Sequence, residues 1–398
     1  MKPSLTPIIG IEIHIELATK TKMFCGCSAD HFRRPPNTHT CPVCLGLPGA
    51  LPMPNKKAIE AVILLAGIFQ SKINRRFLFD RKNYFYPDLP KGYQISQHFF
   101  PIGQGGQVTI MDQGQFVPIA LQDIHLEEDT GKLIHQKDST LIDYNRSGVP
   151  LVEIVSQPNI HSWAQAKEYL KRIQQTARWL GISECDMEKG SMRMEANISL
   201  SPNPKILPDY KVEIKNLNSF RFTQKAIDYE IARQKEIILK GERPKQETRG
   251  YNVQRGITYS QRTKEEAKDY RYFPEPDIPP FEFSLSAIKN ITKKIKTTPW
   301  EKEKELISRF GLSWENSQIL VSNRKMLDLF EEVVKLVKDK KLKSVKLANL
   351  LINKKIPWEN LSPKEVLQAL KEKKDKFLIF CIFISYYINI KTNNNSIF

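Results

Sequence analysis

Residues 12–27, together with a second cysteine pair further along, constrain this chain more than any other feature. The segment begins within G-I-E-I-H-I-E-L, and this strict alternation predicts a strand with Glu12, His14 and Glu16 on one face. Isoleucines occupy the other face. Like charges in one row repel each other unless a cation or a partner group lies between them. The alternation therefore indicates a site for a hard cation on this strand.

A site for a soft metal ion is predicted directly after this strand. The sequence continues C-G-C, then thirteen residues, then C-P-V-C, which is typical of a knuckle-type zinc site with four thiolate ligands: Cys25, Cys27, Cys41 and Cys44. Two histidines of the intervening loop, His31 and His39, are alternative ligands, although we expect both to be bystanders. The competing interpretations are reduced structural cysteines without metal and a redox pair.

The length and charge of the chain set the frame for these sites. The chain has 398 residues, enough for two or three domains, and a formal net charge of +17, which favours a polyanionic partner such as nucleic acid. A lysine-rich proteome would produce part of this excess without any function. The sequence shows neither an N-terminal signal peptide nor an apolar run of about 18 residues. A cytoplasmic protein is therefore expected.

Changes in composition divide the chain. Residues 1–283 contain short strand patterns separated by glycine and proline, and three helical patterns at residues 56–70, 164–180 and 223–240. This mixture predicts an α+β domain with an antiparallel or mixed sheet flanked by helices. After the stiff segment E-P-D-I-P-P, residues 284–376 are lysine-rich and predict an all-α domain. Residues 377–398 form an atypical tail, of which residues 377–390 are an apolar run.

Three further glutamates of the first domain are candidate ligands. Glu128 belongs to H-L-E-E-D, Glu153 to the strand pattern V-P-L-V-E-I-V, and Glu195 to M-R-M-E-A-N-I-S. Each alone is most often a solvated or salt-bridged carboxylate. Together with Glu12 and His14 they favour a metal site, because carboxylates in apolar strands need a cation to offset their desolvation. Magnesium, which prefers carboxylate and phosphate oxygens, is the expected ion, and a nucleoside triphosphate is the expected ligand.

Basic and aromatic residues alternate in residues 80–93, D-R-K-N-Y-F-Y-P-D-L-P-K-G-Y. Such a surface suits phosphate groups and base stacking, and Arg81, Lys82 and Lys91 are the candidates for phosphate contacts. The competing interpretation is an aromatic-rich loop packed over the sheet. A second polar stretch, residues 213–222, leads into a helical pattern. Either Asn218 or Ser219 could cap that helix, and capping alone would explain the presence of such a residue there.

These motifs occur together in an order that resembles a known family. They are I-G-I-E-I-H-I-E-L, F-C-G-C, C-P-V-C-L-G-L-P-G-A-L-P, D-R-K-N-Y-F-Y-P-D-L-P-K-G-Y-Q-I-S-Q, H-L-E-E-D-T-G-K-L, N-R-S-G-V-P-L-V-E-I-V, E-I-K-N-L-N-S-F-R-F and D-Y-R-Y-F-P-E-P-D-I-P-P. Residues 8–280 are similar to the B subunit of the tRNA-dependent amidotransferase, with weaker similarity to about residue 376. The resemblance implies a cradle-like α+β domain, a helical domain and a small C-terminal domain that holds tRNA.

The resemblance implies a two-step reaction on misacylated Glu-tRNA(Gln) or Asp-tRNA(Asn), with ATP, Mg²⁺ and Zn²⁺ as cofactors. The B subunit phosphorylates the side-chain carboxylate of the attached amino acid, and ammonia from the partner amidase (glutaminase) A subunit then displaces the phosphate. A small C subunit completes the complex. Carried over by position, the residues that bind magnesium and support catalysis would be Glu12, His14, Glu128 and Glu153, with Glu195 as a further magnesium ligand.

Two departures from the family pattern matter. The family usually has S-x-R-C-D-A-N where residues 191–197 read S-M-R-M-E-A-N, so the longer side chain of Glu195 moves its carboxylate by about one bond length, ~1.5 Å. Residues 377–398 match no part of the family and resemble the readthrough of an altered frame. We therefore expect the terminal tRNA-binding domain to be missing.

Two alternatives to this function are open at this point. A non-catalytic RNA-binding or assembly subunit would keep the fold and the zinc site but would be impaired in turnover. The archaeal-type paralogue, dedicated to Glu-tRNA(Gln), carries a large inserted domain for which 398 residues leave no room. The motifs do not distinguish Glu-tRNA(Gln) from Asp-tRNA(Asn) as the substrate.

Overall fold

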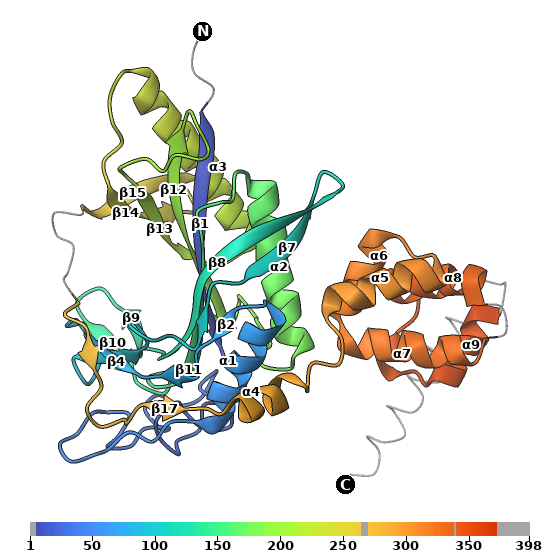
Figure 1. Ribbon diagram of the computed structural model, residues 1–398, viewed down its shortest axis with the longest axis horizontal. Coiled ribbons are helices and arrows are strands. Elements are labelled where there is room, and N and C mark those ends of the chain that lie inside the picture. Colours follow the sequence, from blue (N-terminus) through green and yellow to red (C-terminus); the bar gives the residue numbers. More distant parts are fainter. Residues whose placement is uncertain (1–4, 264–269, 338–339, 372–398) are drawn as a thin grey trace. The chain divides into compact units, whose positions relative to one another are not determined.

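The computed structural model describes residues 5–263, 270–337 and 340–371, which belong to two compact units (Figure 1). The units divide between Lys296 and Thr297, whereas the composition predicted a division at residue 283. The described residues confirm the α+β class, with a mixed sheet and helices in the first unit and helices in the second. The tail predicted at residues 377–398 lies outside the described residues.

A ten-stranded sheet forms the centre of the first unit. Its strands are β1 (Thr6–Glu16), β2 (Lys72–Ile73), β6 (Gly103–Gln104), β7 (Gln107–Asp112), β8 (Gln115–Glu128), β11 (Pro150–Ser156), β12 (Met192–Ser201), β13 (Val212–Leu217), β14 (Glu247–Asn252) and β15 (Ile257–Thr263). The hydrogen-bonded order is β15-β14-β13-β12-β1-β11-β8-β6-β2, with β7 paired to β8. The pair β13 and β14 is parallel, so the sheet is mixed.

Strand β1 lies between β11 and β12 and sets the register of the central sheet. His14 is opposite Glu153 on β11, and Glu12 is opposite Glu195 on β12. The isoleucines of its other face are at most 1 % exposed: Ile9, Ile11, Ile13 and Ile15. Burial of each such side chain contributes about 1.5–3 kcal/mol to folding, so this face fixes which residues point the other way. The alternation predicted from the sequence is confirmed.

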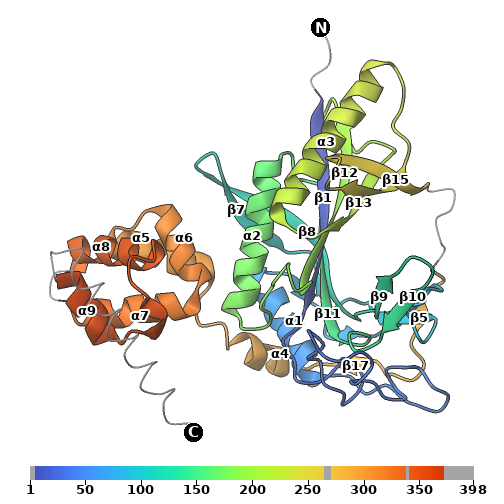
Figure 2. The same cartoon turned by 180° about the vertical axis from the view of Figure 1, so that it is seen from behind.

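Three longer helices pack on the first unit where the helical patterns predicted them: α1 (Lys56–Ile68), α2 (Trp163–Trp179) and α3 (Phe220–Leu239). Each begins at a residue whose side chain accepts hydrogen bonds from first-turn N–H groups, namely Asn55, Ser162 and Ser219. Helix α2 packs on β7, and α3 packs on β12 (Figure 2). The predicted capping role of Ser219 is confirmed.

Smaller sheets complete the first unit. Strand β4 (Asp80–Asn83) pairs with β5 (Tyr93–Ser96) and with β16 (Phe273–Pro274). Strands β9 (Lys132–His135) and β10 (Thr140–Asp143) form a hairpin, and β3 (Arg76–Phe77) pairs with β17 (Phe281–Glu282). Helix α4 (Leu285–Thr292) packs on α1. The pairing of β16 with β4 returns the chain after residue 270 to the aromatic stretch at residues 80–93.

The second unit, which begins at Thr297, is helical, as the composition of residues 284–376 predicted. It contains α5 (Pro299–Phe310), α6 (Trp314–Ser322), α7 (Arg324–Lys335), α8 (Lys340–Ile352), a 3₁₀ turn (Trp358–Asn360) and α9 (Pro363–Lys371). Its core is apolar, and Leu306, Leu320 and Phe330 are fully buried. Helix α5 begins with a capping box in which Thr298 and Glu301 exchange side-chain to backbone hydrogen bonds. Within the described residues, no helix is long and apolar enough to cross a membrane.

Candidate active site and metal centre

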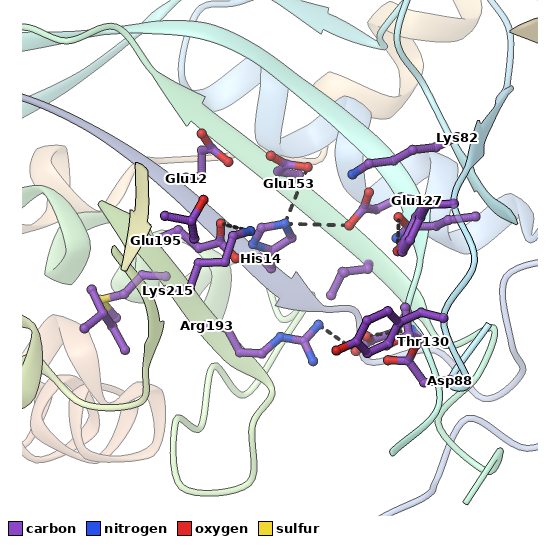
Figure 3. A pocket seen from close by; sticks show the side chains of 18 of the residues that line it. Glu12, His14, Lys82, Asp88, Glu127, Thr130, Glu153, Arg193, Glu195 and Lys215 are labelled. Atoms are coloured by element: carbon purple, nitrogen blue, oxygen red, sulfur yellow. Dashed lines mark hydrogen bonds and ion pairs between the residues drawn. The ribbon is translucent and has the colours of Figure 1, made fainter. Parts of the chain in front are cut away.

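A pocket of about 900 Å³ lies over the polar face of β1 and its neighbours. Strands β1, β8, β11, β12 and β13 supply its floor, and the segment at residues 82–94 supplies part of its wall. Figure 3 shows the carboxylates, the histidine and the lysines that point into it. Because β1 is fixed by its buried isoleucines, Glu12 and His14 are placed in this pocket by the core of the domain.

His14, Glu127 and Glu153 form one cluster in the pocket. The His14 Nε2 atom lies 3.5 Å from Glu153 Oε2 and 3.7 Å from Glu127 Oε1 (Figure 3). One ligand atom from each residue lies within 4.8 Å of the other two. Burial lowers the pKa of His14, but the carboxylates of Glu153 and Glu127 outweigh it and raise that pKa to about 9. Without a metal ion, the positive charge of the His14 imidazolium partly offsets the negative charges of the two carboxylates. A bound divalent cation would offset them instead, and His14 would then be neutral.

His125 lies behind Glu153 and holds it in place. Its Nε2 atom is 3.1 Å from Glu153 Oε2, and its Nδ1 atom is 2.6 Å from Asp123 Oδ1. All three side chains lie on paired strands, with His125 opposite Glu153 in the register of β8 and β11. A carboxylate–histidine pair behind a ligand commonly fixes the orientation of that ligand.

A second acidic cluster comprises Glu12, Glu195 and Glu213, whose ligand atoms also lie within 4.8 Å of one another. The Lys215 Nζ atom is 2.8 Å from Glu195 Oε2 and 3.2 Å from Glu213 Oε1. Asn197 donates a 2.8 Å hydrogen bond to Glu12. Burial, followed by repulsion from Glu153 and the two other carboxylates, raises the pKa of Glu12 to about 7. The longer side chain at Glu195 therefore still reaches the cluster.

Glu128 does not line this pocket, and Glu127 takes the position that the sequence motif assigned to Glu128. Successive side chains of a strand point to opposite faces, so only one of the two can face His14. Glu128 instead pairs with Lys91 and accepts a 3.0 Å hydrogen bond from the backbone N–H of Ile95. The sequence prediction named Glu128 for this cluster, whereas the structure places Glu127 of the same strand beside His14.

Of the three candidate phosphate ligands, Lys82 lines the pocket. Its Nζ atom lies 5.1 Å from the ring centre of Tyr270 and 5.9 Å from that of Tyr84. Burial lowers the pKa of Lys82, but Glu127 and Glu153 outweigh burial and hold it above its ordinary value. Lys82 therefore remains a cation beside the His14 cluster.

Arg81 and Lys91 are engaged elsewhere. The Arg81 Nε and Nη2 atoms donate to Glu275 at 2.7 and 2.9 Å, and Nη2 lies 3.3 Å from Asp277. Lys91 pairs with Glu128, as described above. The structure therefore brings only Lys82 of these three cations to the pocket.

Asp129 and Arg193 form a further pair at the pocket wall. The Arg193 Nη2 atom donates to Asp129 Oδ2 at 2.8 Å, and Arg146 Nε lies 3.8 Å from Asp129 Oδ1. Burial alone would raise the pKa of Asp129, but the two guanidinium groups hold it well below its ordinary range.

The residues near the site that were not predicted from the sequence are Asp129, Arg193, Glu213, Lys215, Glu127 and His125. For Glu127 and His125, the alternation along β8 was the signal that could have found them.

The four predicted cysteines come together in a separate cluster. Their sulfur atoms lie within 4.8 Å of one another, which fits the donor set of a tetrahedral thiolate site. The backbone N–H of Cys41 donates to Cys44 Sγ at 3.2 Å. A hydrogen bond from Cys25, followed by the nearby Lys22, lowers the pKa of Cys44 to about 4 although burial opposes this. His31 instead lies 2.9 Å from Glu16, outside the cluster.

Comparisons with known proteins show which family this chain is similar to. The model of the GatB/GatE catalytic domain matches residues 7–289. The chain is 46% identical over 377 residues to a protein of Thermosipho melanesiensis, covering 93% of this chain and 77% of that protein. It is 46% identical over 337 residues to a protein of Thermotoga maritima, covering 83% and 70%. A Thermus thermophilus protein is 47% identical over 313 residues, covering 79% and 66%. All three are named as the B subunit of aspartyl/glutamyl-tRNA(Asn/Gln) amidotransferase.

Proposed function

This chain belongs to the GatB/GatE catalytic domain family, and we propose that it acts as the B subunit of an aspartyl/glutamyl-tRNA(Asn/Gln) amidotransferase. In this function it phosphorylates the side-chain carboxylate of misacylated Glu-tRNA(Gln), Asp-tRNA(Asn) or both. The observation that carries the proposal is the pocket in which Lys82 lies beside the cluster of His14, Glu127 and Glu153. A cation and hard-metal ligands together suit a nucleoside triphosphate.

The proposed reaction has two steps. A carboxylate oxygen of the aminoacyl group attacks the γ-phosphorus of ATP, the bond to the β–γ bridging oxygen breaks, and ADP leaves. The product is an acyl phosphate, which has the leaving group that a free carboxylate lacks. Ammonia then attacks the acyl carbon, the bond from that carbon to the phosphate oxygen breaks, and an amide forms while the proton lost from nitrogen leaves with inorganic phosphate. Positioning and charge neutralisation supply most of the catalysis in phosphoryl transfer.

The residues of the pocket fit magnesium through their hard carboxylate oxygens, and His14 would add one imidazole nitrogen. His14, Glu127 and Glu153 would hold one ion, and Glu12, Glu195 and Glu213 form a second carboxylate set that would add ligands. When bound, magnesium neutralises phosphate charge during transfer. Glu128, proposed from the sequence as a catalytic residue, has a structural role in this proposal because it is paired with Lys91.

The protein's own groups position the substrates. Lys82 contacts a phosphate oxygen, and Tyr84 and Tyr270, whose ring centres are 5.7 Å apart, flank it at the wall of the pocket. Because the half-buried Lys82 lies close to the carboxylates of Glu127 and Glu153, its ammonium group stays charged in the pocket. His125 and Asp123 act through Glu153, whose orientation they fix.

The four-cysteine cluster is proposed to bind one structural zinc ion. It has four thiolate donors and no open position for a substrate, as closed structural sites have. The ion would join the loop of residues 25–44 to the start of the first unit. A redox role would instead pair the sulfur atoms two by two.

The complex needs further subunits and tRNA. We propose a partner amidase A subunit as the source of ammonia and a small C subunit as the third member. The lysine-rich helical unit is the basic surface for the acceptor arm, through contacts to phosphate groups. A non-catalytic assembly subunit is the less favoured alternative, because it needs neither the two carboxylate clusters nor a half-buried lysine beside one of them.

The test is a reconstituted reaction. The full chain is combined with the A and C subunits, ATP, magnesium, glutamine and Glu-tRNA(Gln) or Asp-tRNA(Asn), and both phosphate release and amidated tRNA are measured. We expect both products to depend on the misacylated tRNA and to disappear with His14→Ala. Amidation that persists in the His14→Ala complex, or its absence in a fully assembled wild-type complex with either tRNA, would contradict the proposal.

A further inference from the structure

Lys22 is a buried lysine beside the four-cysteine cluster, with only 1 % of its surface exposed. Its Nζ atom lies 3.6 Å from Cys44 Sγ and 3.1 Å from the carbonyl oxygen of Tyr144. Its backbone N–H donates a 2.9 Å hydrogen bond to the carbonyl oxygen of Cys27. One residue therefore contacts both cysteine pairs, the first through its backbone and the second through its side chain.

A buried ammonium group requires a negative charge nearby, because removal of a cation from water is costly. The carbonyl oxygen of Tyr144 supplies a dipole but no charge. Glu128 lies across Gly148 from the Lys22 side chain, and it is already paired with Lys91. Because that carboxylate is already paired, it does not supply a separate negative charge for Lys22. Cys44, whose sulfur atom is in contact with the Lys22 ammonium group, can supply one as the thiolate ligand of a bound zinc ion.

Four thiolates around one divalent zinc ion carry a net charge of −2, so a loaded site has an excess of negative charge where Lys22 has an excess of positive charge. An ammonium-to-thiolate hydrogen bond reduces the repulsion between the sulfur ligands and fixes the direction of the Cys44 sulfur atom. Partners behind metal ligands typically change metal affinity by about 10–100-fold.

We propose that Lys22 is the counter-charge and positioning residue of a tetrathiolate zinc site in this chain, holding Cys44 through its ammonium group while its backbone holds the turn at Cys27. This inference rests on the zinc site of the proposed function. It adds a residue outside the cysteine motif that determines how tightly the ion is held.

The test compares zinc affinities of the full chain by competition with a chromogenic chelator, together with the rate of zinc release. Lys22→Met keeps the length of the apolar stem and removes the charge. Lys20→Met makes the same chemical change two residues away on an exposed side chain and is the matched control. We expect Lys22→Met to weaken zinc binding about 10–100-fold and to accelerate release, and Lys20→Met to change neither.

The same Lys22 substitution in a Cys44→His chain separates the effect of the lysine charge from the effect of its packing. In Cys44→His the ligand that contacts Lys22 is a neutral imidazole and the loaded site carries −1 instead of −2, so the addition of Lys22→Met should weaken zinc binding clearly less than it does with Cys44 present. An equal loss on both backgrounds would show that Lys22 only fills space and would overturn the proposal. Lys22→Gln, which is neutral but can still donate to Tyr144, replaces Lys22→Met should that variant not fold. Wild-type zinc affinity in either neutral variant also overturns it. A wild-type chain that binds no zinc would remove the zinc site itself, and with it this inference, while leaving the magnesium pocket untouched.

Discussion

Glu127 and Glu128 are consecutive residues at the end of β8, yet they serve opposite faces of the sheet. Glu127 Oε1 lies 3.7 Å from His14 Nε2 in the pocket, whereas Glu128 accepts hydrogen bonds from Lys91 and from the N–H of Ile95. Both side chains are buried, with 2 % and 3 % of their residue surfaces exposed. Two chemically identical neighbours therefore have different proposed roles, the first in ion binding and the second in structure.

We expect Glu127→Gln to weaken binding of a divalent ion by about tenfold or more, because a metal ligand loses its charge. The same variant should abolish tRNA-dependent ATP hydrolysis. Binding of Mn²⁺ as a probe is measured by electron paramagnetic resonance, and phosphate release is measured in the assembled complex.

The matched variant Glu128→Gln should behave differently. Removal of one partner of a buried ion pair typically costs about 3–5 kcal/mol, so its free energy of unfolding should fall. Its affinity for Mn²⁺ should stay within about twofold of the wild type because the residue lies on the other face. A Glu128→Gln protein that keeps its stability but loses Mn²⁺ would reverse the assignment of the two glutamates.

The Asp129 pair predicts a dependence of stability on pH. Arg193 and Arg146 hold the pKa of the Asp129 carboxyl below its ordinary value of 3.8. A group whose pKa is lower in the folded state stabilises the fold above its ordinary pKa and loses that contribution as the pH falls toward the folded-state value. Asp129→Asn should therefore be less stable than the wild type at pH 7, and this difference should shrink below about pH 4.

Urea unfolding at several pH values measures this difference. Asp138→Asn replaces an exposed aspartate in the turn between β9 and β10 and should leave the stability nearly unchanged at every pH. A difference between wild type and Asp129→Asn that is constant from pH 7 to the acid limit of folding would show that the carboxylate charge contributes nothing.

The sequence predicted those parts of the fold that follow from local periodicity. The polar face with Glu12 and His14 and the opposite face of buried isoleucines both follow from a period of two residues. This period can be read from the sequence of a single strand. The cap at Ser219 is likewise local, because a cap contacts only the first turn of its own helix. The α+β class followed from the mixture of these local patterns.

The sequence could not show which strands lie together. Glu213 reaches Glu12, and Lys215 reaches Glu195, only because β13 pairs with β12, and this pairing depends on contacts between distant segments. Arg81 has the guanidinium group expected of a phosphate ligand, but its charge is neutralised by Glu275 and Asp277, which lie almost two hundred residues later in the chain. For Glu128, the structure differs from the prediction by one residue along β8, because neighbouring side chains of a strand face opposite sides of the sheet.

The cysteine cluster gives a metal prediction. Cys41→Ser removes one of four thiolates, so zinc content should fall from about one ion per chain to well below one, and the thermal midpoint should decrease. Cys185→Ser is the control, because Cys185 is buried but lies outside the cluster. Elemental analysis and thermal unfolding measure both effects. Equal zinc content in the two variants would contradict the four-cysteine site.

The two neighbouring cations of β4 provide the last prediction. Lys82 is directed into the pocket, whereas Arg81 is held by Glu275. Lys82→Met should raise the KM for ATP by about tenfold or more, since a buried charge on a phosphate group is lost. Arg81→Met should leave that KM within about twofold and should instead lower the free energy of unfolding, because it leaves the buried Glu275 carboxylate unpaired. Steady-state ATP hydrolysis in the assembled complex and urea unfolding of the isolated chain separate the two effects. If Arg81→Met raised the KM and Lys82→Met did not, the phosphate contact would belong to Arg81, which would then have to leave Glu275 when the nucleotide binds.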